Sequence, residues 1–165
     1  MIYREMIQVV SKGEHPTFHD LTDKVSEICA RSGIQEGICT IVTTHTTCSV
    51  ITGEYAHDFT ENGTGFLQQD LCNIMEQIIP TCRAAGQYLH PGPNHIESGL
   101  NDTQPGSWSM LNTDAHLRSA LIGRDVTLIV RNGQPDLGDY ACVYFIDWDQ
   151  VRARPRRVTV QVMGE

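Results

Sequence analysis

The chain opens on alternating apolar and polar positions, which predict a β-strand over residues 2–10. A helical spacing follows, and its apolar face consists of Leu21, Val25, Ile28 and Cys29. Asp20 is a suitable N-cap for this helix, and Gly33 is a suitable end. Residues 37–52 are rich in β-branched side chains, which favour either two strands or one long bent strand.

A second helix is predicted for residues 65–79, because Pro80 stops a run with helical periodicity. Its apolar stripe consists of Leu67, Leu71, Ile74, Met75, Ile78 and Ile79. We expect this stripe to pack into the core of the domain.

Residues 84–112 lack periodicity and are rich in glycine and proline, which predicts a long loop of the kind that often carries function. After it we expect a short helix or turn ending at Gly123. Three strands are then predicted at 126–132, 140–148 and 156–164, the last with Val158, Val160 and Val162 on one face. This order predicts an α+β fold: a mostly antiparallel β-sheet with two main helices packed on one face, in one compact domain spanning residues 1–165.

Composition narrows the functional classes. The formal net charge of −8 argues against a general nucleic-acid or membrane-surface binder, because both need a basic face. No apolar stretch approaches the length of a membrane span. The six cysteines form no C-x-x-C pair, so we expect free thiols in a cytoplasmic protein.

Three of the seven histidines stand at junctions between a loop and a regular element: His45, His90 and His116. Three imidazoles from separate segments can bind zinc and leave one coordination position open, as catalytic zinc sites do. The spacing itself matches no metal-binding motif, so the hypothesis rests on the three imidazoles alone: they would bind a divalent metal, with zinc as the best match to imidazole ligands. The alternative of purely structural histidines stays open.

Five short segments in one order carry a family resemblance: HTTCSV at 45–50 with Glu54 and Ala56 after it, YLH at 88–90, DAHLRSALIG at 114–123, NGQPDLG at 132–138, and RPRRVTVQVMGE at 154–165. They resemble the YjbQ family, of which this chain is identified as a divergent member. The resemblance implies a small α+β homotrimer. It also implies a secondary thiamine-phosphate synthase activity, which joins a pyrimidine diphosphate to a thiazole phosphate and releases pyrophosphate.

The resemblance also suggests roles for residues. His45 and Glu54 match the histidine and the glutamate of the family's H-T-[ST]…N-E-N run, and they are the candidate catalytic residues, with Glu54 in acid–base work. His45, His90 and His116 are the candidate metal ligands. The candidate substrate contacts are Thr47, Asp114 and Arg118, although Arg118 also fits a solvated surface charge.

Departures from the family pattern leave the function open. The family's N-E-N-A-D reads GEYAH at residues 53–57, and its T-W-Q reads DYA at 139–141. The first hypothesis is a metal-dependent enzyme that acts on a small phosphorylated molecule, without a nucleic-acid or membrane partner. The second is a trimer that binds a metabolite or metal without chemistry.

Overall fold

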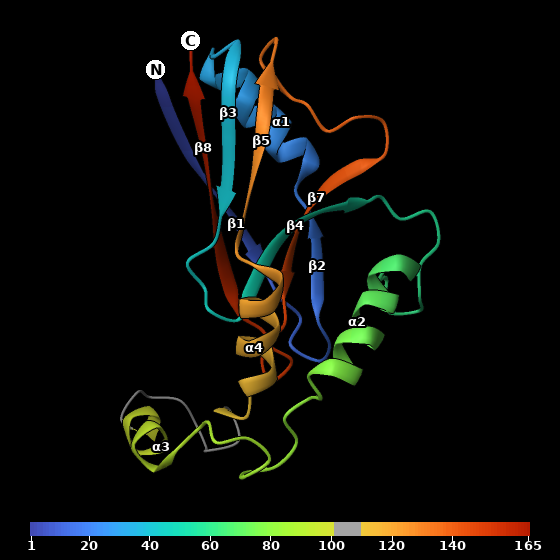
Figure 1. Cartoon of the computed structure of the whole chain (residues 1–165), viewed down its shortest axis with the longest axis vertical. Coiled ribbons are helices and arrows are strands. Elements are labelled where there is room, and N and C mark those ends of the chain that lie inside the picture. Colours follow the sequence, from blue (N-terminus) through green and yellow to red (C-terminus); the bar gives the residue numbers. More distant parts are fainter. Residues whose placement is uncertain (101–109) are drawn as a thin grey trace.

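Two antiparallel β-sheets and four helices form the part of the chain that the computed structural model describes, residues 1–100 and 110–165 (Figure 1). The strands are β1 (Ile2–Val10), β2 (Thr17–Asp20), β3 (Glu36–Val42), β4 (Cys48–Glu54), β5 (Asp125–Arg131), β6 (Gln134–Pro135), β7 (Ala141–Asp147) and β8 (Pro155–Gly164). The helices are α1 (Thr22–Ser32), α2 (Phe66–Ile78), α3 (Pro93–Leu100) and α4 (Thr113–Ile122). The predicted α+β class is confirmed.

The strands divide into a five-stranded sheet, in the order β1-β8-β3-β5-β6, and a three-stranded sheet, in the order β2-β7-β4. A single sheet was expected. This detail is wrong, because the run rich in β-branched residues at 37–52 forms two strands that belong to different sheets. Its first half, β3, pairs with β5 and β8, whereas its second half, β4, pairs with β7. Periodicity identifies both strands but carries no information about their partners.

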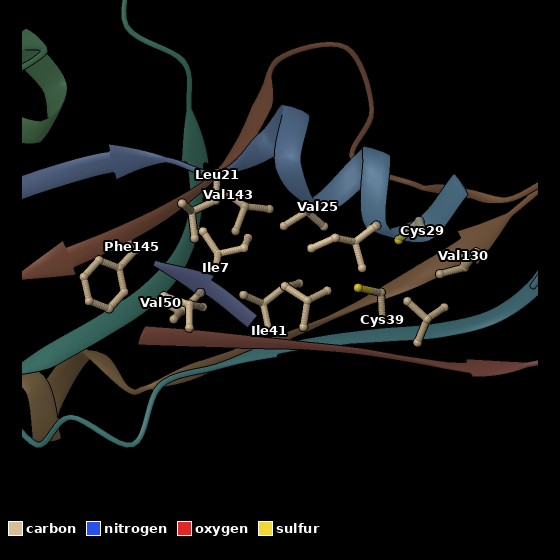
Figure 2. Close-up of a cluster of buried hydrophobic side chains, with 14 of the residues drawn as sticks. Ile7, Leu21, Val25, Cys29, Cys39, Ile41, Val50, Val130, Val143 and Phe145 are labelled. Carbon is tan, nitrogen blue, oxygen red and sulfur yellow. The ribbon is translucent and has the colours of Figure 1, made fainter. Parts of the chain in front are cut away.

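The main hydrophobic core lies between α1 and the two sheets (Figure 2). Val25 and Cys29 of α1 are completely buried, as the helical spacing predicts. Asp20 was expected at the N-cap of α1, but Leu21 occupies that position and makes no side-chain cap hydrogen bond; Asp20, one residue earlier, accepts the backbone N–H of Thr22 at 2.9 Å through Oδ1. Gly33 ends the helix with a left-handed φ of 72°, which favours glycine. The three alternating valines of β8 are buried in the same core.

Helix α2 departs in part from expectation, because half of its apolar stripe does not reach the core. Met75 is 2% exposed and Leu71 and Ile79 pack against the same small core cluster, but Leu67, Ile74 and Ile78 are 52%, 50% and 60% exposed. In Figure 1 the helix stands to one side of both sheets, joined to β4 by a loop that swings outward. The prediction of core packing is therefore confirmed for one half of the stripe and wrong for the other half, which leaves an apolar strip of the helix open.

The predicted loop over 84–112 contains α3, and it ends where α4 begins. The short helix expected before Gly123 is confirmed as α4. Residues 101–109 of the loop lie outside the described part of the chain.

A buried ion pair joins the two sheets. Arg156, near the start of β8, donates from Nε to Asp147 Oδ2 at 2.6 Å and from a terminal nitrogen to Asp147 Oδ1 at 3.1 Å. Asp147 ends β7, so this fork of two hydrogen bonds crosses from one sheet to the other. The same guanidinium donates to Thr47 Oγ1 at 3.1 Å and lies 3.6 Å from Asp149.

All six cysteines are free, and five of them are buried. None of the described helices has both the length and the apolar character that crossing a membrane requires.

Replacing Arg156 by alanine should lower the free energy of unfolding by about 3–5 kcal/mol, because it leaves Asp147 charged, buried and unpaired. Arg157→Ala is the matched control, since the adjacent Arg157 is exposed and its loss should cost less than about 0.5 kcal/mol. Urea unfolding followed by circular dichroism measures both. Equal effects of the two substitutions would contradict a special role for the buried pair.

Candidate functional site

Three imidazoles meet beside the amino-terminal part of α4. The ring of His90 lies 5.5 Å from that of His116 and 4.6 Å from that of His95, measured between centroids. His116 belongs to α4, His95 to α3, and His90 to the connection between α2 and α3. Thr113, the first residue of α4, donates its hydroxyl to the backbone carbonyl of His90 at 2.6 Å and so ties this connection to the helix. We call His90, His95 and His116 the histidine cluster.

The environment of His90 and His116 favours neutral imidazoles. Burial, followed by the charge of His95, lowers the pKa of His90. Burial, followed by the charge of His90, lowers the pKa of His116. Nε2 of His90 is buried and has no hydrogen-bond partner among the described residues. A neutral imidazole with an unused nitrogen can ligate a metal, accept a proton or bind a ligand donor.

His116 also has a defined orientation. The ring of His116 donates a hydrogen bond to the backbone of Thr46. This bond stabilises the protonated ring, and it therefore offsets part of the lowering of the pKa of His116. The neutral imidazole then keeps a lone pair on its other nitrogen. This arrangement, in which one nitrogen is anchored and the other is available, is the usual one for ligating histidines.

His45 lies in a different environment from the cluster. Its Nε2 accepts the backbone N–H of Arg157 at 3.0 Å. Burial, followed by the charge of Arg156, lowers the pKa of His45, so the ring is neutral and its proton must be on Nδ1. Within one chain, His45 therefore links the β3–β4 connection to β8, and the lone pair on its Nε2 is occupied by this hydrogen bond.

Glu54 does not approach the cluster within the chain. It is exposed and ends β4, whereas His45 precedes the other end of this strand. Seven residues of strand at about 3.3 Å each separate the two ends by roughly 20 Å. The expected bend that would bring the carboxylate back to His45 is absent, because β4 pairs continuously with β7.

Arg118 and Asp114 are held by the protein itself. Arg118 is 1% exposed, which rules out a solvated surface charge. It donates to the carbonyl of Ile79 and, at 2.7 Å, to Glu76. Asp114 accepts the backbone N–H of Cys82 at 3.0 Å and lies 3.7 Å from Arg118. The two residues fasten the end of α2 to α4.

Thr47 is also engaged in the fold, since it is buried and its hydroxyl accepts from Arg156. Its carbonyl accepts the backbone N–H of Trp148 at 3.0 Å. Of the expected metal ligands, the described contacts bring His90 and His116 together, whereas Asp114 and Arg118 meet each other in a structural ion pair.

A hollow of about 390 Å³ adjoins the cluster on the side of His116. Its other lining residues include Thr46, Ser119 and Arg124, so hydroxyls and a guanidinium surround a neutral imidazole. Sequence reasoning missed Arg124 and His95. The only signal for His95 was its position five residues after His90 in the long loop, and Arg124 had no signal except its place directly after α4.

The cluster meets part of the requirement for a metal. The ring of His116, which a hydrogen bond anchors, and the ring of His90, whose Nε2 has no partner among the described residues, are both suitable zinc ligands. However, no three His, Cys, Asp or Glu side chains of residues 1–100 and 110–165 are grouped as a metal site needs. The tri-histidine set expected from His45, His90 and His116 is therefore not assembled in one chain.

These features define a class of small α+β proteins with two antiparallel sheets and a histidine cluster at one end of a short helix. The family description "UPF0047 protein YjbQ-like" matches residues 6–165, and the chain belongs to this family. The resemblance inferred from the sequence motifs is thereby confirmed.

Relatives match along most of the chain. A UPF0047 protein of Synechocystis is 27% identical over 99% of this chain and 92% of its own length. A UPF0047 protein of Methanothermobacter thermautotrophicus is 28% identical over 88% of this chain and 82% of its own length. A crystal structure of a YbjQ-like protein of unknown function from Sulfolobus solfataricus is 25% identical and has a TM-score of 0.73, covering 100% of this chain and 99% of that one.

Stability should fall as the pH drops below about 6.5. The pKa values of His90 and His116 are lowered in the native state, so the unfolded chain binds protons at a higher pH than the native protein does. Each group then removes up to about 1.4 kcal/mol of unfolding free energy per pH unit between the unfolded and the native pKa. Urea unfolding at pH 7.5 and 5.5 measures this loss. His116→Gln should reduce it, whereas the same change at exposed His57 should not; equal losses in all three proteins would contradict the assignment.

Proposed function

We propose that this chain is a metal-dependent transferase that acts on a small phosphorylated molecule, as the YjbQ resemblance implies. The observation that carries the proposal is the histidine cluster beside the hollow that contains Arg124. Neutral imidazoles next to a guanidinium combine metal ligands with a phosphate contact in one place. The six free thiols are consistent with the cytoplasmic location expected from the sequence.

His90 and His116 would hold the metal, for which zinc is our choice. Zinc, when bound, supplies polarisation of a phosphate oxygen or activation of a water molecule. Arg124 is exposed and can form a two-fold hydrogen bond with a phosphate. The Ser119 hydroxyl donates its hydrogen to the carbonyl of Cys48 at 2.6 Å. Its oxygen can therefore still accept a hydrogen bond from a substrate in the hollow.

The second candidate, a protein that binds a metabolite or metal without chemistry, is favoured by one observation. The residues expected to do acid–base or substrate work, Glu54, Asp114 and Arg118, lie away from the cluster or are held by the fold. A site with ligands but no acid–base residue binds without turning over. The experiment below separates the two candidates.

His90→Ala and His116→Ala should each remove most of the zinc from protein purified without an affinity tag and should abolish pyrophosphate release from the pyrimidine diphosphate and thiazole phosphate pair. Arg124→Ala should keep zinc but raise the KM about 10- to 150-fold, the equivalent of one lost charged hydrogen bond. Arg131→Ala is its control, because Arg131 is exposed on β5 and outside the hollow.

Zinc content is measured by inductively coupled plasma mass spectrometry, and pyrophosphate by a coupled enzyme assay. Zinc binding without pyrophosphate release by the unaltered protein would favour the non-catalytic candidate. Full zinc content in both histidine variants would contradict the metal site itself.

We also propose that the chain assembles as a homotrimer, and the open face of α2 supports an assembly. Leu67, Ile74 and Ile78 recur at helical spacing on one stripe, and all three are at least half exposed. Beside them, α2 and β4 enclose a groove of about 370 Å³ whose lining includes Ile51, Leu67 and Ile74. A contiguous apolar surface of this kind is typical of a surface that a partner covers.

Light scattering on the eluting protein should therefore give three times the chain mass of 18.4 kDa. Ile74→Asp should shift the species to the monomer, because a buried, unpaired carboxylate at an interface is strongly unfavourable. The control, Lys24→Asp on the exposed side of α1, should leave the trimer unchanged. A stable monomer at micromolar concentration would contradict the proposal.

A further inference from the structure

A second hollow lies away from the histidine cluster, beneath the connection from β4 to α2. Its volume is about 220 Å³, the liquid volume of roughly seven water molecules. Strands β2 and β7, the connection at 55–65 and the start of α2 all contribute to its lining. In Figure 1 this connection is the loop that leads from the end of β4 to α2.

Aromatic rings dominate this lining: Phe18, Tyr55, Phe59 and Tyr144. Phe18 and Tyr144 are in edge contact, with ring centroids 6.4 Å apart and planes at 78°. Tyr55 and Phe59 come from the loop and are 38% and 57% exposed, so their rings are accessible to a ligand. The negative face of an aromatic ring attracts a cation, and several rings around one hollow form a site for organic ammonium groups.

The polar atoms of the lining add acceptors and no basic side chain. Asp20 supplies a carboxylate of which Oδ1 accepts hydrogen bonds from the backbone N–H and the hydroxyl of Thr22. Gln68 is 5% exposed, and its Oε1 has no hydrogen-bond partner among the described residues. Its amide nitrogen donates to the carbonyl of Glu54 at 3.1 Å. Rotating the amide so that the nitrogen takes the place of the oxygen at the hollow would break this hydrogen bond.

Gly65 leaves space for this oxygen. A Cβ added at Gly65 would lie 2.0 Å from Gln68 Oε1, so a larger residue here would displace the amide oxygen from its present position in the lining. A buried acceptor without a partner costs free energy, and a ligand that donates a hydrogen bond recovers it. The net charge of −8 further favours a positively charged ligand.

We propose that this aromatic hollow, formed by Phe18, Asp20, Tyr55, Phe59, Gln68 and Tyr144, binds a small organic ammonium ion that carries one hydrogen-bond donor. The ammonium group lies against the aromatic rings and near Asp20. The donor group reaches Gln68 Oε1. This binding site is independent of the metal and the transfer reaction proposed for the histidine cluster.

Choline is the probe, because its trimethylammonium group and single hydroxyl match the two features of the hollow. 3,3-Dimethylbutan-1-ol is its neutral counterpart, with the same shape and hydroxyl but without the charge. Isothermal titration calorimetry should detect binding of choline and much weaker binding of the neutral alcohol. Equal binding of both would overturn the proposal in favour of an unselective apolar hollow, and no binding of choline would overturn it outright.

Tyr55→Leu and Phe59→Leu should each weaken choline binding about 2- to 30-fold, the range expected for one cation–π contact. Both side chains are partly exposed, so the variants should keep the fold, which circular dichroism checks. Tyr140→Leu is the matched control, since Tyr140 is 65% exposed and outside the lining. An equal loss in this control would overturn the assignment of the aromatic rings.

Two further variants separate this site from the histidine cluster. Asp20→Asn keeps an oxygen acceptor for Thr22 but removes the charge, and it should weaken choline binding more than binding of the neutral alcohol. His116→Ala should leave choline binding unchanged even where it removes zinc. Loss of choline binding in His116→Ala would overturn the independence of the two sites.

Discussion

The ion pair between Arg156 and Asp147 is the constraint on which the arrangement of the two sheets depends. It is almost fully buried, and it joins the start of β8 in one sheet to the end of β7 in the other. Thr47 completes the coordination of the guanidinium from the connection between β3 and β4. Next to it, His45 accepts the backbone N–H of Arg157 and closes the same joint. The end of β7 and the start of β8, nine residues apart, are thereby fixed together with the β3–β4 connection, which lies 109 residues from Arg156 in sequence.

The hydrogen bonds around Arg156 and Arg157 also determine which histidine nitrogens are available to a ligand. The lone pair of His45 Nε2 is occupied by the backbone N–H of Arg157, and the backbone of the neighbouring residue Thr46 contacts the ring of His116. His90 and His95 then arrive from the connection after α2, which Thr113 fastens to α4. A histidine that resembles a family's motif residue thus supports the site through its position rather than through a free nitrogen.

Helix α2 links the two remaining surfaces of functional interest. Its carboxyl-terminal end is fixed to α4 through Glu76 and Arg118, whereas Leu67, Ile74 and Ile78 of its apolar stripe face outward. At its other end Gln68 and Gly65 contribute to the aromatic hollow. The proposals of a trimer and of an ammonium site thus both depend on surfaces of this one helix.

The sequence by itself determined some of the elements and their buried faces: the strand of residues 2–10, the buried face of α1 and its end at Gly33, the valines of β8, and the family. These features depend on local periodicity and on capping, both of which the order of residues contains. The tertiary structure decided the pairing of β3 and β4 in separate sheets, the buried state of Arg118 and the distance of Glu54 from the cluster. It also decided the meeting of His95 with His90, because partners across a fold depend on where whole elements pack, which no local pattern specifies.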